Sequence, residues 1–132
     1  MEIKISRERL VERFLRYVSV DTQSDPQSET FPSTAKQLTL LNLLLEEMLA
    51  LGLSDAEIDP HGYVTGTVPA TPGHEGKPVI GLISHVDTSP DMAGAGVKPQ
   101  FVQDYDGNDI RLNDTLTMRV ADFPELALFK GH

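Results

Sequence analysis

The chain has 132 residues, of which 39% are hydrophobic, so its length suits one ordinary domain with a core of its own. Its 11 basic and 20 acidic side chains give a formal net charge of −9, which argues against nucleic acid or an anionic membrane as a partner, because both require a positive surface. There is no cysteine, so disulfide bonds and thiolate metal sites are excluded.

The N-terminal stretch MEIKISRERLVERF carries charge throughout and has no apolar core of signal-peptide length. No run of about 18 apolar residues occurs anywhere in the chain, so the sequence predicts no membrane-spanning segment. We therefore expect a cytoplasmic protein.

The first expected element is a helix from Ser6 to Val18. Ser6 is a residue typical of helix N-caps. Apolar residues recur at helical spacing along one face, at Leu10, Val11, Phe14, Leu15 and Val18. This pattern predicts an amphipathic helix with one buried stripe.

The stretch SVDTQSDPQSETFPST follows and is expected to be an exposed loop. A second helix is expected from Ser33 or Thr34 to Leu51, with Thr34 and Gln37 as a capping box and Gly52 at its end. Its apolar face is formed by leucine and methionine, at Leu38, Leu41, Leu44, Leu45, Met48 and Leu49. Glu46 and Glu47 are expected on its solvated face.

Two strands joined by a tight turn at Pro60-His61-Gly62 are expected next, the second within Tyr63 to Val68. Val79 to Ser84 is the most apolar strand candidate and has no polar alternation. Such a strand is typical of the middle of an α/β sheet, where both faces are covered.

Beyond Pro90 the pattern weakens. Short extended pieces are expected around a turn at Asp106-Gly107, and a short helix is expected after Pro124. Because an α/β domain needs further strands and a closing helix to cover its sheet, we expect the chain to be the front part of a larger α/β domain.

His85 and Asp87 follow the apolar strand candidate directly and are separated by one valine. Side chains alternate in an extended segment, so these two are expected on the same side. Ligands bind beyond the C-terminal ends of strands in open α/β sheets, and neutral imidazole is a good zinc ligand. Asp87 would then either orient the ring through its second nitrogen or ligate the metal directly.

A structural alternative has Asp87 merely capping the next turn through Thr88 and Ser89. The other histidines have no partner at metal-ligand spacing. His61 is expected in a solvated turn, and His74 is expected in an exposed loop rich in glycine and proline.

Five stretches carry a resemblance to a known family: LVERFLRYVSVDTQSD, FPST, HGYVTGTVPA, VIGLISHVDTSPD and VKPQFVQDYDGNDIRLN. They are similar to the N-terminal part of tripeptide aminopeptidases in the family of di-zinc metallopeptidases related to carboxypeptidase G2 and aminoacylase. The resemblance covers the chain from about Leu10 to Gly131.

The resemblance implies a three-layer α/β catalytic domain with a central mixed sheet, flanking helices and a second, smaller domain inserted later in the chain. It implies that His85 binds one of two zinc ions and that Asp87 is an active-site residue that orients His85. It further implies a tripeptide substrate, and it is compatible with a homodimer of the full-length protein.

Residues 1–132 then form only the N-terminal portion of the catalytic domain, without the bridging aspartate, the glutamate pair, the remaining ligands and the inserted domain. Because a zinc site needs about four ligands, we expect the fragment alone to be inactive. The alternative is a non-enzymatic, acidic α/β interaction module or a degenerate remnant.

Overall fold

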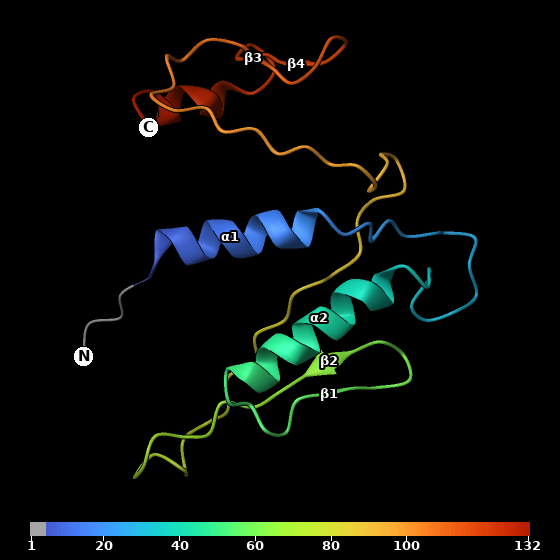
Figure 1. The fold of residues 1–132 in the computed structure, drawn as a ribbon. Coiled ribbons are helices and arrows are strands. Elements are labelled where there is room, and N and C mark those ends of the chain that lie inside the picture. The colour runs from blue at the N-terminus through green and yellow to red at the C-terminus, as the bar shows by residue number, and fades with distance from the viewer. Residues whose placement is uncertain (1–4) are drawn as a thin grey trace. The chain divides into compact units, whose positions relative to one another are not determined.

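A computed structural model describes residues 5–132. The N-terminal stretch in which no signal peptide is expected begins with residues 1–4, and these lie outside the described residues. The chain divides into two units, Met1–Val97 and Lys98–His132. The first contains helices α1 (Arg7–Val18) and α2 (Gln37–Ala50) and strands β1 (Glu57–Ile58) and β2 (Val64–Thr65). The second contains strands β3 (Ile110–Arg111) and β4 (Thr117–Met118) and a 3-10 helix, η1 (Pro124–Phe129) (Figure 1). Among residues 5–132, no helix is long and apolar enough to span a bilayer.

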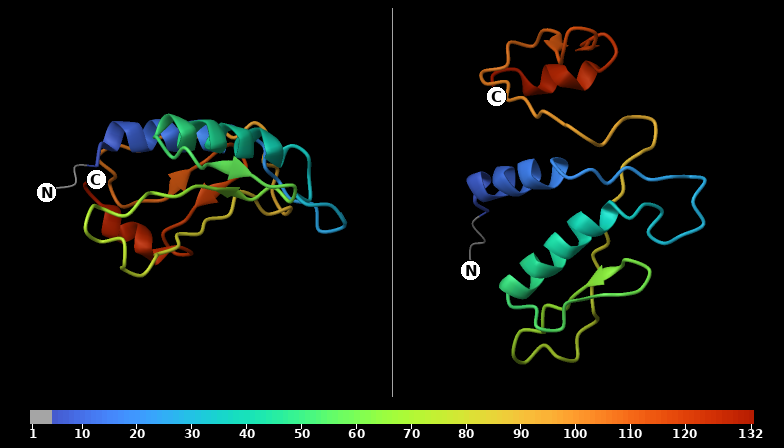
Figure 2. Two further views of the ribbon diagram at one scale, coloured as in Figure 1. Left: turned by 90° about the horizontal axis from the view of Figure 1, so that it is seen from below. Right: turned by 45° about the vertical axis from the view of Figure 1, so that its right-hand side comes forward.

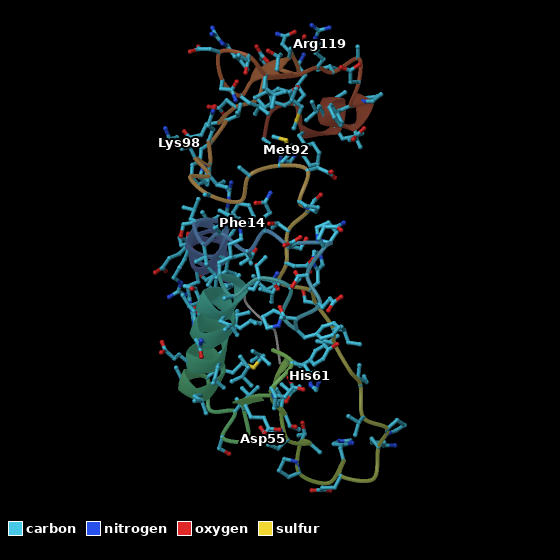
Figure 3. The ribbon with its side chains drawn as sticks, turned by 90° about the vertical axis from the view of Figure 1, so that its right-hand side faces the viewer. Phe14, Asp55, His61, Met92, Lys98 and Arg119 are labelled. Atoms are coloured by element: carbon cyan, nitrogen blue, oxygen red, sulfur yellow. The ribbon has the colours of Figure 1, made fainter. Side chains whose placement is uncertain are left out.

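Helix α1 runs over Arg7–Val18, as the sequence predicts. The Ser6 hydroxyl caps it by accepting a hydrogen bond from the backbone N–H of Arg9, at 3.3 Å. The expected apolar stripe is only partly covered, because the side chains of Leu10 and Phe14 are 61% and 59% exposed. Figure 3 shows Phe14 on this helix, while Asp55 and His61 lie with the β1–β2 hairpin.

Helix α2 spans Gln37–Ala50, and it therefore begins three or four residues later than the expected start at Thr34 or Ser33. The predicted capping box is not formed: Lys36 occupies the N-cap, and the Gln37 amide instead donates to the Ser33 and Thr34 hydroxyls. The prediction for the other end is confirmed. Gly52 has φ +92, a left-handed conformation that glycine adopts without strain, and it closes the helix.

Strands β1 (Glu57–Ile58) and β2 (Val64–Thr65) form an antiparallel pair with Glu57 opposite Thr65. The expected turn joins them, and the carboxylate of Asp59 accepts the backbone N–H groups of His61 and Tyr63. The hairpin lies alongside α2 in all three ribbon views (Figures 1 and 2). Leu40 and Leu41 of α2 are buried, at 7% and 5% exposure.

In the second unit, β3 (Ile110–Arg111) pairs antiparallel with β4 (Thr117–Met118), and η1 covers Pro124–Phe129. The expected short helix after Pro124 is therefore present. The expected turn at Asp106-Gly107 is confirmed by Gly107 at φ +88 and by the Asp106 carboxylate, which accepts the Asn108 backbone N–H at 2.9 Å.

The prediction of a buried strand at Val79–Ser84 is wrong for this structure. The segment is extended but belongs to no ladder, and Val79, Leu82 and Ile83 are 94%, 95% and 100% exposed. A strand is buried only when neighbours cover its edges and faces, and the described sheets are two separate antiparallel pairs. The architecture is thus mixed helix and small antiparallel sheets, which is consistent with part of an α/β fold.

Candidate functional site

His85 and Asp87 lie just beyond the exposed apolar segment, and the structure brings their side chains together. Nδ1 of His85 is 2.8 Å from the backbone oxygen of Asp87 and 3.2 Å from its carboxylate Oδ1. Both oxygens are acceptors, so Nδ1 must carry the proton and donate. The lone pair of the neutral ring is then on Nε2.

This geometry is the arrangement in which an imidazole is oriented for metal binding, because a fixed Nδ1–H directs the Nε2 lone pair outward. The His85 side chain is 84% exposed, so the ring is open to an incoming ion. The alternative in which Asp87 caps the next turn is not seen in the described part of the chain: the Ser89 hydroxyl bonds with Asp91 instead, at 2.8 Å.

The remaining histidines do not join His85. His61 is exposed in the β1–β2 turn, and His74 is exposed in its loop, as expected. Residues 5–132 contain no group of three or more histidine, aspartate or glutamate side chains arranged to hold a metal. The described residues therefore contain a histidine ring oriented by Asp87, and they do not complete a metal shell.

An open hollow of about 1220 Å³ in the first unit is lined in part by the pair. The residues that line it include Leu40 and Leu41 of α2, Leu82 and Ile83, and the His85–Asp87 pair. The wall is mainly apolar, whereas the histidine–aspartate pair supplies polar groups. Because Leu82 and Ile83 are 95% and 100% exposed, the hollow is open to solvent on that side.

Polar residues of the loop before α2 also reach this region, and the sequence did not single them out. Thr22 is 2% exposed, although its stretch was expected to be an exposed loop. The backbone N–H of Gln23 and the Lys36 ammonium group hold the pKa of Asp21 below its ordinary value. The same loop pairs in parallel with Thr88, the residue after Asp87.

No family model matches the chain. Curated relatives do match: a peptidase from a Geobacillus species is 50% identical over 128 residues, which cover 96% of this chain and 31% of the relative. Relatives from Clostridium acetobutylicum (52% identical over 126 residues, 94% of this chain and 31% of the relative) and Bacillus subtilis (48% over 128 residues, 96% and 31%) match in the same way.

The class of protein that these relatives define is a peptidase. Each of the three is named peptidase T, and the chain spans about a third of their length. The resemblance predicted from the sequence is therefore confirmed, and the match is consistent with an N-terminal portion of peptidase T.

Proposed function

We propose that the chain forms the N-terminal portion of the catalytic domain of a metal-dependent aminopeptidase, which removes the N-terminal residue from tripeptides. The observation that carries the proposal is the His85–Asp87 pair. Nδ1 of His85 is 2.8 Å from the backbone oxygen of Asp87 and 3.2 Å from Oδ1 of its carboxylate, which leaves Nε2 for a metal. The similarity to peptidase T over 96% of the chain supports the substrate class.

In this proposal His85 is a ligand of one of two zinc ions, and Asp87 keeps the imidazole in the tautomer that presents Nε2. A zinc ion bound there would lower the pKa of a bound water, so that the water would be nucleophilic near neutral pH. Asp87 holds this tautomer of His85 through two acceptors, its backbone oxygen and its carboxylate, so rotation of the ring would break both hydrogen bonds at once. The cytoplasmic location and the homodimer stay predictions from the sequence.

The completed fold in this proposal is the three-layer domain with a central mixed sheet. The Val79–Ser84 segment supports it, because an uncharged, extended and exposed run of this kind is suited to pairing with further strands. The remaining metal ligands, the general base and the inserted smaller domain then belong to other parts of the full-length protein.

The proposal can be tested in a chimera in which this chain replaces the matching third of the Bacillus subtilis peptidase T. We expect the chimera to hydrolyse a tripeptide, to lose activity with a chelator and to regain it with zinc. His85→Ala should lower kcat/KM at least about 100-fold, because a metal ligand is lost. His74→Ala is the matched control and should change it less than about twofold.

A chimera that melts cooperatively, binds zinc and yet cleaves no tripeptide would contradict the substrate class. Equal activity of the His85→Ala and His74→Ala chimeras would contradict the role of His85. If the chimera were inactive while the 132-residue chain unfolded cooperatively by itself, the acidic interaction module would be the better interpretation.

A further inference from the structure

Two segments more than sixty residues apart are fastened to each other beside the His85–Asp87 pair. The backbone N–H of Ser24 donates to the carbonyl of Thr88 at 2.9 Å, and the N–H of Thr88 donates to the carbonyl of Thr22 at 3.1 Å. The Ser24 hydroxyl also donates to the Thr88 carbonyl, at 2.9 Å. We call this set of contacts between residues 21–24 and 88–92 the clasp.

The side chain of Gln23 adds two hydrogen bonds to the clasp. Its amide nitrogen donates to the carbonyl oxygens of Pro90 at 2.9 Å and Met92 at 3.0 Å. Its amide oxygen accepts from the Lys36 ammonium group at 3.3 Å. A lysine can only donate and a carbonyl can only accept, so these partners determine which way the amide faces.

Lys36 is itself held, because its ammonium group forms an ion pair with Asp21 at 3.0 Å. The Asp21 carboxylate also accepts the backbone N–H of Gln23, at 3.0 Å. The Gln23 side chain is thus oriented from one side by Lys36 and binds the 90–92 turn on the other. This arrangement connects the start of α2 to the turn that follows Asp87.

The clasp acts on the site through one peptide plane. The Asp87 carbonyl and the Thr88 N–H belong to the same planar peptide unit. The Thr88 N–H is bonded to Thr22, and the Asp87 carbonyl accepts the Nδ1 proton of His85. The hydrogen bond from Thr88 to Thr22 therefore restricts the orientation of the Asp87 carbonyl that accepts from His85.

We propose that Gln23 is a positioning residue for His85, acting through the Thr88 peptide to hold the acceptor of the imidazole in place. The relevance of this role to catalysis rests on the proposed function. The positioning itself does not, because the contacts are present in the chain without metal or peptide.

The test uses the 132-residue chain and nuclear magnetic resonance, with Gln23→Ala and the isosteric Gln23→Glu, which removes the amide donor. Gln27→Ala and Gln27→Glu are the matched controls, because Gln27 is exposed in the same loop and its side chain makes no hydrogen bond to any described residue. Two readouts are followed: hydrogen exchange at the Thr88 and Ser24 amides, and the tautomer of His85 from its ring nitrogen and carbon shifts at about pH 8, where imidazole is neutral.

We expect both Gln23 variants to lower the protection of these two amides by about tenfold, the order expected for losing two neutral hydrogen bonds. They should also lower the share of His85 that carries its proton on Nδ1. The Gln27 controls should match the unmodified chain in both readouts. A merely structural role for Gln23 would change protection and leave the tautomer as it was.

The proposal is overturned if the His85 tautomer is the same in the Gln23 and Gln27 variants. If the Gln23 variants do not fold, hydrogen exchange is measured in the unmodified chain instead. The Thr88 amide must then exchange more slowly than the amide of Val86, whose backbone N–H has no partner in the described part of the chain. Equal exchange at these two amides would also overturn it. Failure of metal binding or peptide hydrolysis would contradict the proposed function and leave these results intact.

Discussion

The phenolic oxygen of Tyr17 on α1 donates a hydrogen bond of 2.5 Å to the carboxylate of Glu47 on α2. The same carboxylate forms ion pairs with Arg16 and, at 3.5 Å, with Arg13. Glu47 is only 17% exposed in its side chain, so the expectation of a solvated face holds for Glu46 but is wrong for Glu47. One carboxylate joins the two helices.

Replacing Tyr17 by phenylalanine should lower the free energy of unfolding by about 1–2 kcal/mol, because the half-buried Glu47 carboxylate loses a donor. Urea denaturation measures the change. Tyr63→Phe is the control, since Tyr63 is 67% exposed and its hydroxyl has no partner among residues 5–132. Equal stabilities of the two variants would show that the interhelical bond contributes nothing.

The Tyr17–Glu47 pair also predicts that the free energy of unfolding depends on pH in the alkaline range. Burial raises the pKa of Tyr17 above 10.0, and the hydrogen bond to Glu47 and its charge raise that pKa further. A raised folded-state pKa stabilises the protein fully below the ordinary value, and this contribution is lost as the pH rises through the folded-state value. Unfolding free energy should therefore fall above about pH 10 in the unmodified chain and less steeply in Tyr17→Phe. Parallel curves would contradict the pKa shift as a source of stability.

Gly94 allows the clasp to close. A Cβ at this position would lie 2.5 Å from Oδ1 of Asp21 and 3.4 Å from Cβ of Gln23. Gly94→Ala should therefore displace the Asp21 carboxylate from the Gln23 N–H and destabilise the first unit by about 1 kcal/mol. Gly76→Ala is the control, because nothing lies within 4 Å of its added carbon. The rate of amide exchange at Gln23 should increase only in Gly94→Ala. An unchanged rate at Gln23 in that variant would refute the close approach of Gly94 to the Asp21 carboxylate.

The exposed Val79–Ile83 segment predicts self-association of the isolated chain. An uncharged extended run with unpaired backbone groups is a template for strand addition. Ile83→Glu should lower the associated fraction in sedimentation velocity without lowering stability, because Ile83 is 100% exposed. Val68→Glu, at a residue that is 78% exposed elsewhere in the chain, should leave association unchanged. Association that survives Ile83→Glu would show that another surface is responsible.

Local elements could be predicted from the sequence because their signals are local. Ser6 and the helical spacing after it correctly predicted α1, and Gly52 correctly predicted the end of α2. The His85–Asp87 pairing also followed from two-residue alternation along an extended segment.

Long-range contacts could not be predicted in this way. Gln23 reaches Pro90 across 67 positions, and no periodicity in either segment encodes that pairing. Glu47 was misjudged for a related reason: its surroundings depend on Tyr17 of the other helix, not on its place in α2. Val79–Ser84 has the composition of a buried strand, but burial depends on neighbours that hydrophobicity alone does not specify.

The proposed role of His85 as a metal ligand can be measured as the metal content of the chimera with the Bacillus subtilis enzyme. Zinc bound per chain, measured by elemental mass spectrometry after dialysis, should fall in His85→Ala, because one imidazole ligand is removed. His74→Ala should retain the zinc of the parent chimera. A His85→Ala chimera that folds and keeps its full zinc content would show that His85 is not a metal ligand.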